Sequence, residues 1–156
     1  MTHVERLIAL IEAHQPADLP RRAVVDPATG ESFATFAVST PAHVDTAVAA
    51  AQQASRANAV RPLVERRAIL SALADVIEAE TDGLAVLLTR EQGKPITHAR
   101  DEITWSAWLF RNYAALRSEF TGDLFDEATP THRRLDRPPG VVAGIVPGEL
   151  PFLSSA

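Results

Sequence analysis

The chain has 156 residues, a formal net charge of -5 and no cysteine. The acidic balance argues against nucleic acid or an anionic membrane as a partner, because both attract clustered lysine and arginine. The lack of thiols excludes disulfides, thiolate metal sites and a cysteine nucleophile within these residues. No apolar run approaches the roughly 18 residues of a membrane span, and Glu5, Arg6 and Glu12 interrupt any signal-peptide pattern, so we expect a cytoplasmic protein.

The first 38 residues predict a helix followed by a β ribbon. Thr2 and Glu5 have the spacing of a capping box, and apolar side chains recur at helical spacing through residues 3–14. Residues 23–38 predict two short strands around the turn DPATG, whose glycine is free to adopt a positive φ. We expect a half-buried antiparallel ribbon in this stretch.

Helical patterns dominate the following residues, up to about residue 119. Thr40 before Pro41 marks one helix start, and Thr81 is a candidate cap for a later helix. In the stretch EQGKP, Gly93 suits a left-handed helix end and Pro95 suits the start of the next helix. The apolar faces of these helices predict a layer that needs a flat partner such as a sheet.

Four aromatic residues lie within this last helix: Trp105, Trp108, Phe110 and Tyr113. A surface that stacks on a base or a substrate is one interpretation of them. Their helical spacing favours core packing or an interdomain contact instead.

Two different segments follow the helices. Residues 121–137 mix turn residues with short alternating stretches and predict an exposed β excursion. Residues 141–146 form a continuous apolar run, typical of a strand buried on both faces of a parallel sheet. One such strand cannot form a sheet alone, so the sequence predicts an α/β architecture that is incomplete within these residues.

Six short motifs occur in order along the chain: DPATGE (26–31), HVDTAVAAAQQA (43–54), RRAILSALADVIE (66–78), EQGKP (91–95), FRNYAAL (110–116) and PPGVVAGIVP (138–147). Each motif is weak alone. Together, in this order and spacing, they closely resemble the N-terminal portion of the NAD(P)-dependent aldehyde dehydrogenase superfamily. The resemblance spans nearly all of the chain but only about the first third of a typical family member.

The resemblance implies a fold and a domain organisation. Residues 1–120 would be the helical N-terminal part of the cofactor-binding domain, including the ribbon at 23–38. Residues 121–140 would be a β oligomerisation arm, and residues 141–156 the first Rossmann-like strand with a ligand-facing turn. The expected fold class is therefore α/β, with a helical layer, a short antiparallel β arm and the first strand of an incomplete Rossmann-like domain.

The resemblance also implies roles for the turn that follows the predicted strand. Val146, Pro147 and Gly148 match positions that pass the nicotinamide side of the cofactor. Glu149 matches an asparagine that donates a hydrogen bond to the oxyanion formed during the reaction. An ionised carboxylate has no proton to donate and would repel the developing negative charge, so we assign no catalytic residue.

A cation site is the remaining implication of the resemblance. Some family members bind a monovalent cation through a backbone carbonyl, matched here by Val25, and an acidic side chain, matched here by Glu102. The plainer interpretation is that Glu102 is an ordinary exposed residue.

The implied function is oxidation of an aldehyde to an acid with NAD or NADP. The family's cysteine nucleophile, glutamate base and glycine-containing phosphate turn all lie beyond the position matching Ala156, so we expect neither this activity nor cofactor binding from these residues alone. Two alternatives stay open: a non-catalytic module that forms a homo-oligomer or pairs with a dehydrogenase subunit, and a gene remnant. These residues fix neither the aldehyde nor the choice between NAD and NADP.

Overall fold

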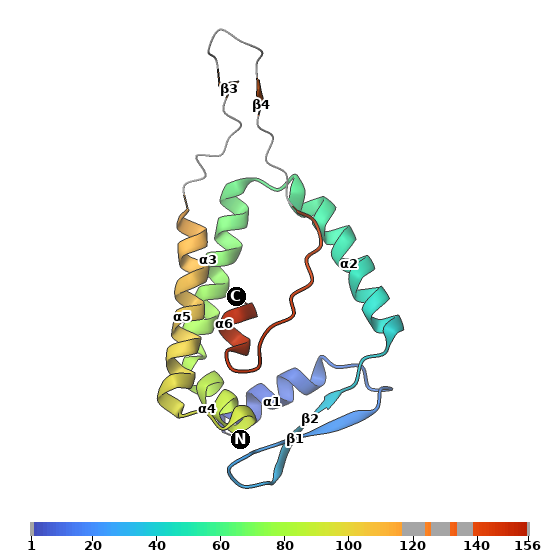
Figure 1. Ribbon diagram of the computed structural model, residues 1–156, viewed down its shortest axis with the longest axis vertical. Helices are drawn as coiled ribbons and strands as arrows, with labels where there is room; N and C mark the ends of the chain where they lie inside the picture. Colours follow the sequence, from blue (N-terminus) through green and yellow to red (C-terminus); the bar gives the residue numbers. More distant parts are fainter. Residues whose placement is uncertain (1, 117–123, 126–131, 134–138, 156) are drawn as a thin grey trace.

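The computed structural model describes residues 2–116, 124–125, 132–133 and 139–155. Its elements, in chain order, are α1 (His3–Ala13), β1 (Arg21–Val25), β2 (Ser32–Ala37), α2 (Pro41–Ala59), α3 (Leu63–Ala79), α4 (Thr81–Gln92), α5 (Ile96–Ala115), β3 (Leu124–Phe125), β4 (His132–Arg133) and α6 (Pro151–Ser155). The helices and the β1–β2 ribbon form an open frame, with α3 and α5 side by side and α2 standing apart (Figure 1). The C-terminal segment runs inside this frame and ends in α6.

The capping box that begins α1 is confirmed. The Glu5 N–H donates to Thr2 Oγ1 at 3.2 Å, and the Thr2 N–H donates to Glu5 Oε2 at 2.7 Å. The antiparallel ribbon is confirmed as well, with β1 paired to β2 and Gly30 at a φ of 75° in the turn between them. Local turn and cap chemistry therefore sets the first elements of the chain.

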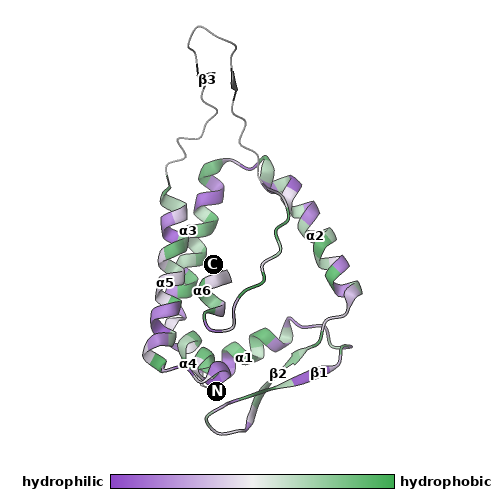
Figure 2. Ribbon diagram, viewed as in Figure 1, coloured by the Kyte–Doolittle hydropathy of each residue, from purple (hydrophilic) through white to green (hydrophobic). Residues whose placement is uncertain are grey.

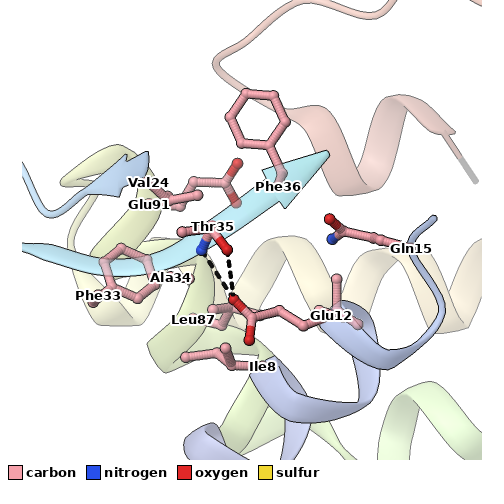
Figure 3. A pocket seen from close by; sticks show the side chains of 11 residues that line it. Ile8, Glu12, Gln15, Val24, Phe33, Ala34, Thr35, Phe36, Leu87 and Glu91 are labelled. Atoms are coloured by element: carbon pink, nitrogen blue, oxygen red, sulfur yellow. Dashed lines mark hydrogen bonds between the residues drawn. The ribbon is translucent and has the colours of Figure 1, made fainter. Parts of the chain in front are cut away.

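Side chains of α1 and of the residues that follow it cover the outer edge of β2. Glu12 accepts hydrogen bonds from the Thr35 N–H and hydroxyl, both at 3.0 Å, and Gln15 Oε1 accepts from the Ala37 N–H at 2.6 Å. The N–H groups of Thr35 and Ala37 in β2, which do not bond to β1, are thus satisfied by these two side chains instead of by a third strand; Figure 3 shows the bonds to Glu12.

The predicted helix start at Pro41 and helix end at Gly93 are confirmed, and one predicted cap is wrong. Helix α2 begins at Pro41, and Gly93 ends α4 with a φ of 75° while its N–H donates to the Thr89 carbonyl at 2.7 Å. The prediction that Thr81 caps α4 is wrong, because Thr81 is already the first residue of that helix. Its hydroxyl instead donates to the Glu78 carbonyl at 2.9 Å, satisfying the end of α3.

The core lies where α3, α4 and α5 meet. Its buried members are small or aliphatic, which allows close helix contact: Ile77, Ala85, Leu88, Ala99, Ile103 and Ala107. Phe152 of α6 packs against this cluster from the C-terminal segment. At the surface, Arg111 of α5 donates to Asp75 at 2.7 Å and to Glu78 at 2.8 Å, tying α5 to α3.

The strand predicted at 141–146 is not formed as a hydrogen-bonded strand within the described residues. The segment is hydrophobic, as Figure 2 shows, yet Val142 and Ile145 are exposed. The described part of the chain contains no parallel strand with which it can pair, so it lies extended without a ladder. Its place as the first strand of a Rossmann-like sheet, like the domain limits given above, stays a prediction.

Two further features complete the fold. In the stretch predicted as a β excursion, β3 pairs antiparallel with β4, and the rest of residues 117–138 lies outside the described residues. Helix α2 has no buried residue along its whole length. Among the helices that the structure describes, none has both the length and the apolar character needed to cross a bilayer.

Candidate functional site

The turn assigned to the cofactor and oxyanion lies at the corner between α4 and α5. We call residues 147–153 the closing turn. Gly93 ends α4 and Pro95 precedes α5, so Lys94 lies between the two helices. The Gln92 amide donates to the Gly148 carbonyl at 2.6 Å, and Lys94 Nζ donates to the Glu149 carbonyl at 2.6 Å. The EQGKP motif therefore does more than end a helix, because two of its side chains bind the closing turn.

Glu102 is buried at the same corner, with only 1% of its surface exposed. The interpretation of Glu102 as an ordinary exposed residue is therefore wrong. Its carboxylate forms an ion pair with Lys94 and accepts hydrogen bonds from the N–H groups of Phe152 at 2.8 Å and Leu153 at 3.1 Å. The charge is neutralised and both oxygens are engaged, which offsets the cost of burying a carboxylate.

The two residues predicted to hold a monovalent cation are not linked by any hydrogen bond or ion pair between described residues. Val25 lies at the end of β1, and the neighbouring Asp26 pairs with Arg90 at 3.5 Å. Glu102 instead binds Lys94, which supplies the positive charge at that place. The acidic side chains that line a cavity together with Val24 of β1 are Glu12 and Glu91. A cation at Val25 and Glu102 stays a prediction that these contacts do not favour.

Val146, Pro147 and Gly148, the predicted cofactor-binding residues, lie in the exposed extended segment and at the start of the closing turn. The Gly148 carbonyl is already bound by Gln92. The Glu149 side chain is exposed, and only its backbone carbonyl is bound to the helical layer. The structure thus presents a carboxylate where the resemblance implies an amide donor.

A cavity of about 370 Å³ lies beside the closing turn. The residues that line it come from the α4–α5 corner and the turn: Lys94, His98, Asp101, Glu102, Trp105, Glu149 and Leu150. No group of three or more His, Cys, Asp or Glu side chains able to hold a metal ion is found among the described residues. The sequence did not indicate this cavity, because its walls come from segments about 50 residues apart.

The aromatic residues of α5 are not core residues, apart from Phe110, which packs against the core. Trp105 and Trp108 are 60% and 62% exposed, and Tyr113 is exposed as well. Core packing is therefore the wrong interpretation for these three, whereas an interdomain contact stays a prediction. Trp105 is the one that lines the cavity beside the closing turn.

A second cavity, of about 300 Å³, lies between α1 and the ribbon (Figure 3). Its polar side chains Glu12 and Gln15 are already bonded to β2, and the remaining wall includes Ile8, Phe33 and Leu87. Hydrogen bonds from Thr35, first from its backbone N–H, hold the pKa of Glu12 below the ordinary 4.5. The contacts of Glu12 and Gln15 indicate a structural junction between α1 and the ribbon.

Comparison with known proteins agrees with the motif order. The aldehyde dehydrogenase family model matches residues 14–156. N-succinylglutamate 5-semialdehyde dehydrogenase 1 of Caulobacter vibrioides is 36% identical over 128 residues, which are 81% of this chain and 27% of that protein. The NADP/NAD-dependent aldehyde dehydrogenase PuuC of Escherichia coli is 34% identical, over 83% of this chain and 27% of its own length. The chain thus spans about a quarter of these relatives.

Solved structures give the same result for the fold. Betaine aldehyde dehydrogenase of Staphylococcus aureus, in complex with NAD+, superposes with a TM-score of 0.82 at 24% identity, over 90% of this chain and 29% of that chain. Aldehyde dehydrogenase of Brucella melitensis biovar abortus gives a TM-score of 0.68 at 30% identity, over 74% of this chain and 24% of its own. By motif order, family match and fold, this chain belongs to the aldehyde dehydrogenase family.

Proposed function

We propose that residues 1–156 serve as the helical N-terminal part of an enzyme that oxidises an aldehyde to an acid with NAD or NADP. The closing turn is the observation that carries the proposal. Gln92, Lys94 and Glu102 hold it against the helical layer of an aldehyde dehydrogenase family chain. Relatives named as semialdehyde dehydrogenases, including one named for NADP(+), support a semialdehyde as the substrate.

In this proposal the chain contributes position, and other residues contribute the reacting groups. The nucleophile must come from residues outside these 156, because they contain no thiol. The described residues also do not fit a complete NAD(P) site, since they offer no glycine-rich turn at a helix N-terminus for the diphosphate. What they offer is the backbone of Val146 and Pro147 beside the expected nicotinamide position.

The direct test is an activity assay on the purified 156-residue chain. We expect no NADH or NADPH formation with short aliphatic aldehydes and semialdehydes, measured by absorbance against a heat-treated sample. Isothermal titration with NAD+ and NADP+ is expected to show no saturable binding. Turnover above the heat-treated sample would overturn the proposal that other residues supply the nucleophile.

We further propose that the partner is a dehydrogenase polypeptide that supplies the neighbouring strand. The support is the apolar extended segment 141–146, which has no ladder, and α2, which has no buried residue. A strand with unpaired backbone groups is a template for pairing with another chain. The homo-oligomer is the competing assembly, and sedimentation of the purified chain distinguishes the two.

Affinity purification from the native cell tests this partner. The tagged chain is expected to recover a polypeptide that matches the cysteine-bearing remainder of the family. Ile145→Lys, which places a charge on the exposed apolar segment, is expected to abolish recovery, whereas Val76→Lys, at an exposed apolar site of α3, serves as the matched control. Recovery of no dehydrogenase polypeptide, or equal recovery with Ile145→Lys, would contradict the proposal.

A further inference from the structure

Three side chains of the α4–α5 corner bind the backbone of the closing turn at four places. Gln92 and Lys94 reach the carbonyls of residues 148 and 149, while Glu102 receives the N–H groups of residues 152 and 153. Lys94 Nζ also binds the Glu102 carboxylate, so one ion pair touches both sides of the turn. We propose that Lys94 and Glu102 form a positioning pair that fixes the closing turn on the helical layer.

The closing turn has little other support. The segment before it forms no ladder within the described residues, and α6 has only five residues, none of them buried. A helix this short is not stable alone, because nucleation costs more than so few hydrogen bonds return. Apart from the packing of Phe152 against the core, the position of the turn depends on the polar contacts of the corner.

The chemistry of the pair suits a rigid link. The ammonium of Lys94 donates to a carboxylate oxygen and to a backbone carbonyl, and the other carboxylate oxygen accepts from two N–H groups. Hydrogen bonds to charged groups are about twice as strong as neutral ones, and they gain further in a buried place. Removing either charge leaves the other buried without its partner, and the turn then loses contacts on both sides.

The pair acts on residue 149 through the backbone alone. Holding the Glu149 carbonyl sets where the side chain at that position points, and the resemblance places that side chain beside the reacting carbonyl. Lys94 and Glu102 are therefore positioning residues, and no contact with a substrate is needed for their role. Only this consequence for a reaction rests on the proposed function, because the positioning itself is measurable in the 156-residue chain.

Amide hydrogen exchange of Phe152 and Leu153 tests the pair. Glu102→Gln keeps the size and an acceptor oxygen but removes the charge, and we expect these two amides to exchange about tenfold faster. Lys94→Met is expected to have the same effect, and Lys94→Arg to restore most of the protection, since arginine retains the charge and the donors. The amides of Ile103 and Ala107 in the core part of α5 serve as the internal reference and are expected to be unchanged.

Asp101→Asn is the matched control variant. Asp101 is the neighbour of Glu102, lines the same cavity and is exposed, so the variant makes the same charge change without touching the closing turn. We expect no change in the exchange of Phe152 and Leu153. The proposal is overturned if Glu102→Gln leaves these amides unchanged, if it accelerates the α5 amides equally, or if Lys94→Arg exchanges like Lys94→Met. The absence of a dehydrogenase partner would leave all these results unaffected.

Discussion

Gly93 connects two of the motifs that the chain shares with its family. Its φ of 75° is a conformation that side chains with a Cβ rarely adopt, and a Cβ placed there would lie 2.9 Å from Pro27 Cγ in the ribbon turn. We therefore expect Gly93→Ala to lower the free energy of unfolding by about 1–2 kcal/mol. Urea denaturation measures this change.

Gly144→Ala is the control for that substitution. Gly144 has no neighbouring atom within 4 Å of an added Cβ and lies in the extended segment, so we expect its effect on the urea midpoint to stay within about 0.5 kcal/mol. Equal effects of the two alanine substitutions would show that the left-handed conformation of Gly93 and its closeness to Pro27 do not set the cost of Gly93→Ala.

Residue roles were predictable from the sequence where they depend on neighbours in the chain. The capping box of Thr2 and Glu5 and the left-handed Gly93 follow from spacing and residue type alone. The burial of Glu102 does not, because its N–H donors lie 50 and 51 positions further along the chain. Nothing in the residues around Glu102 indicates a buried ion pair.

The layer formed by α3, α4 and α5 is held by apolar burial more than by its surface ion pairs. Ile103 is completely buried at the centre of the core, so Ile103→Ala is expected to cost about 2–5 kcal/mol of unfolding free energy. Arg111 bridges α3 and α5 on the surface, where screened ion pairs contribute less than about 1 kcal/mol, so Arg111→Gln is expected to have a small effect. Chemical denaturation of both variants gives the ranking, and the reverse order would contradict it.

Helix α1 is attached by two carboxylates whose charge the native structure favours. Hydrogen bonds from His3 and Arg6 hold the pKa of Glu80 below the ordinary 4.5, and those from Thr35 do the same for the pKa of Glu12. Because these pKa values are lowered in the native state, the ionised carboxylates stabilise the attached helix above pH 4.5. This contribution is lost as the pH falls through the native pKa values. We expect α1 amides to lose protection against hydrogen exchange below about pH 4.5, before those of the core in α5.

The variant Glu12→Gln with Glu80→Gln tests this explanation. Glutamine does not titrate, so the acid-dependent loss at α1 should be much smaller in the double variant, while the attachment at neutral pH is weaker from the start. An unchanged pH profile would show that other groups release the helix.

Elements whose partners lie among the described residues were predictable, and elements without a partner there were not. The ribbon and the helix layer match their sequence patterns, because a turn or an adjacent helix completes each one. Trp105 and Trp108 have the spacing of an apolar face, yet periodicity does not tell which face another part of the molecule covers. The apolar run 141–146 has the pattern of a buried strand, but the described residues provide no neighbouring strand.

The described part of the chain has a small core for its length. Eight of its hydrophobic residues are buried, and four of these are alanines: Leu7, Ala74, Ile77, Ala85, Leu88, Ala99, Ile103 and Ala107. We expect a broad thermal transition with an unfolding enthalpy well below the roughly 110 kcal/mol of a compact domain of this length. Scanning calorimetry measures it, and a sharp two-state transition of a monomer with the full enthalpy would contradict the expectation.

The contacts of Glu12 and Gln15 with β2 distinguish its outer edge from the apolar run 141–146. Donors on the outer edge of β2 are occupied by Glu12 of α1 and by Gln15 just after it, so a further copy cannot add there without displacing α1. The run 141–146 has no such cover, no internal proline and no charge, which are the features of segments that stack into cross-β fibrils. Amyloid growth in this protein would therefore start at the C-terminal segment, and a partner strand of the kind proposed above would also act as its inhibitor.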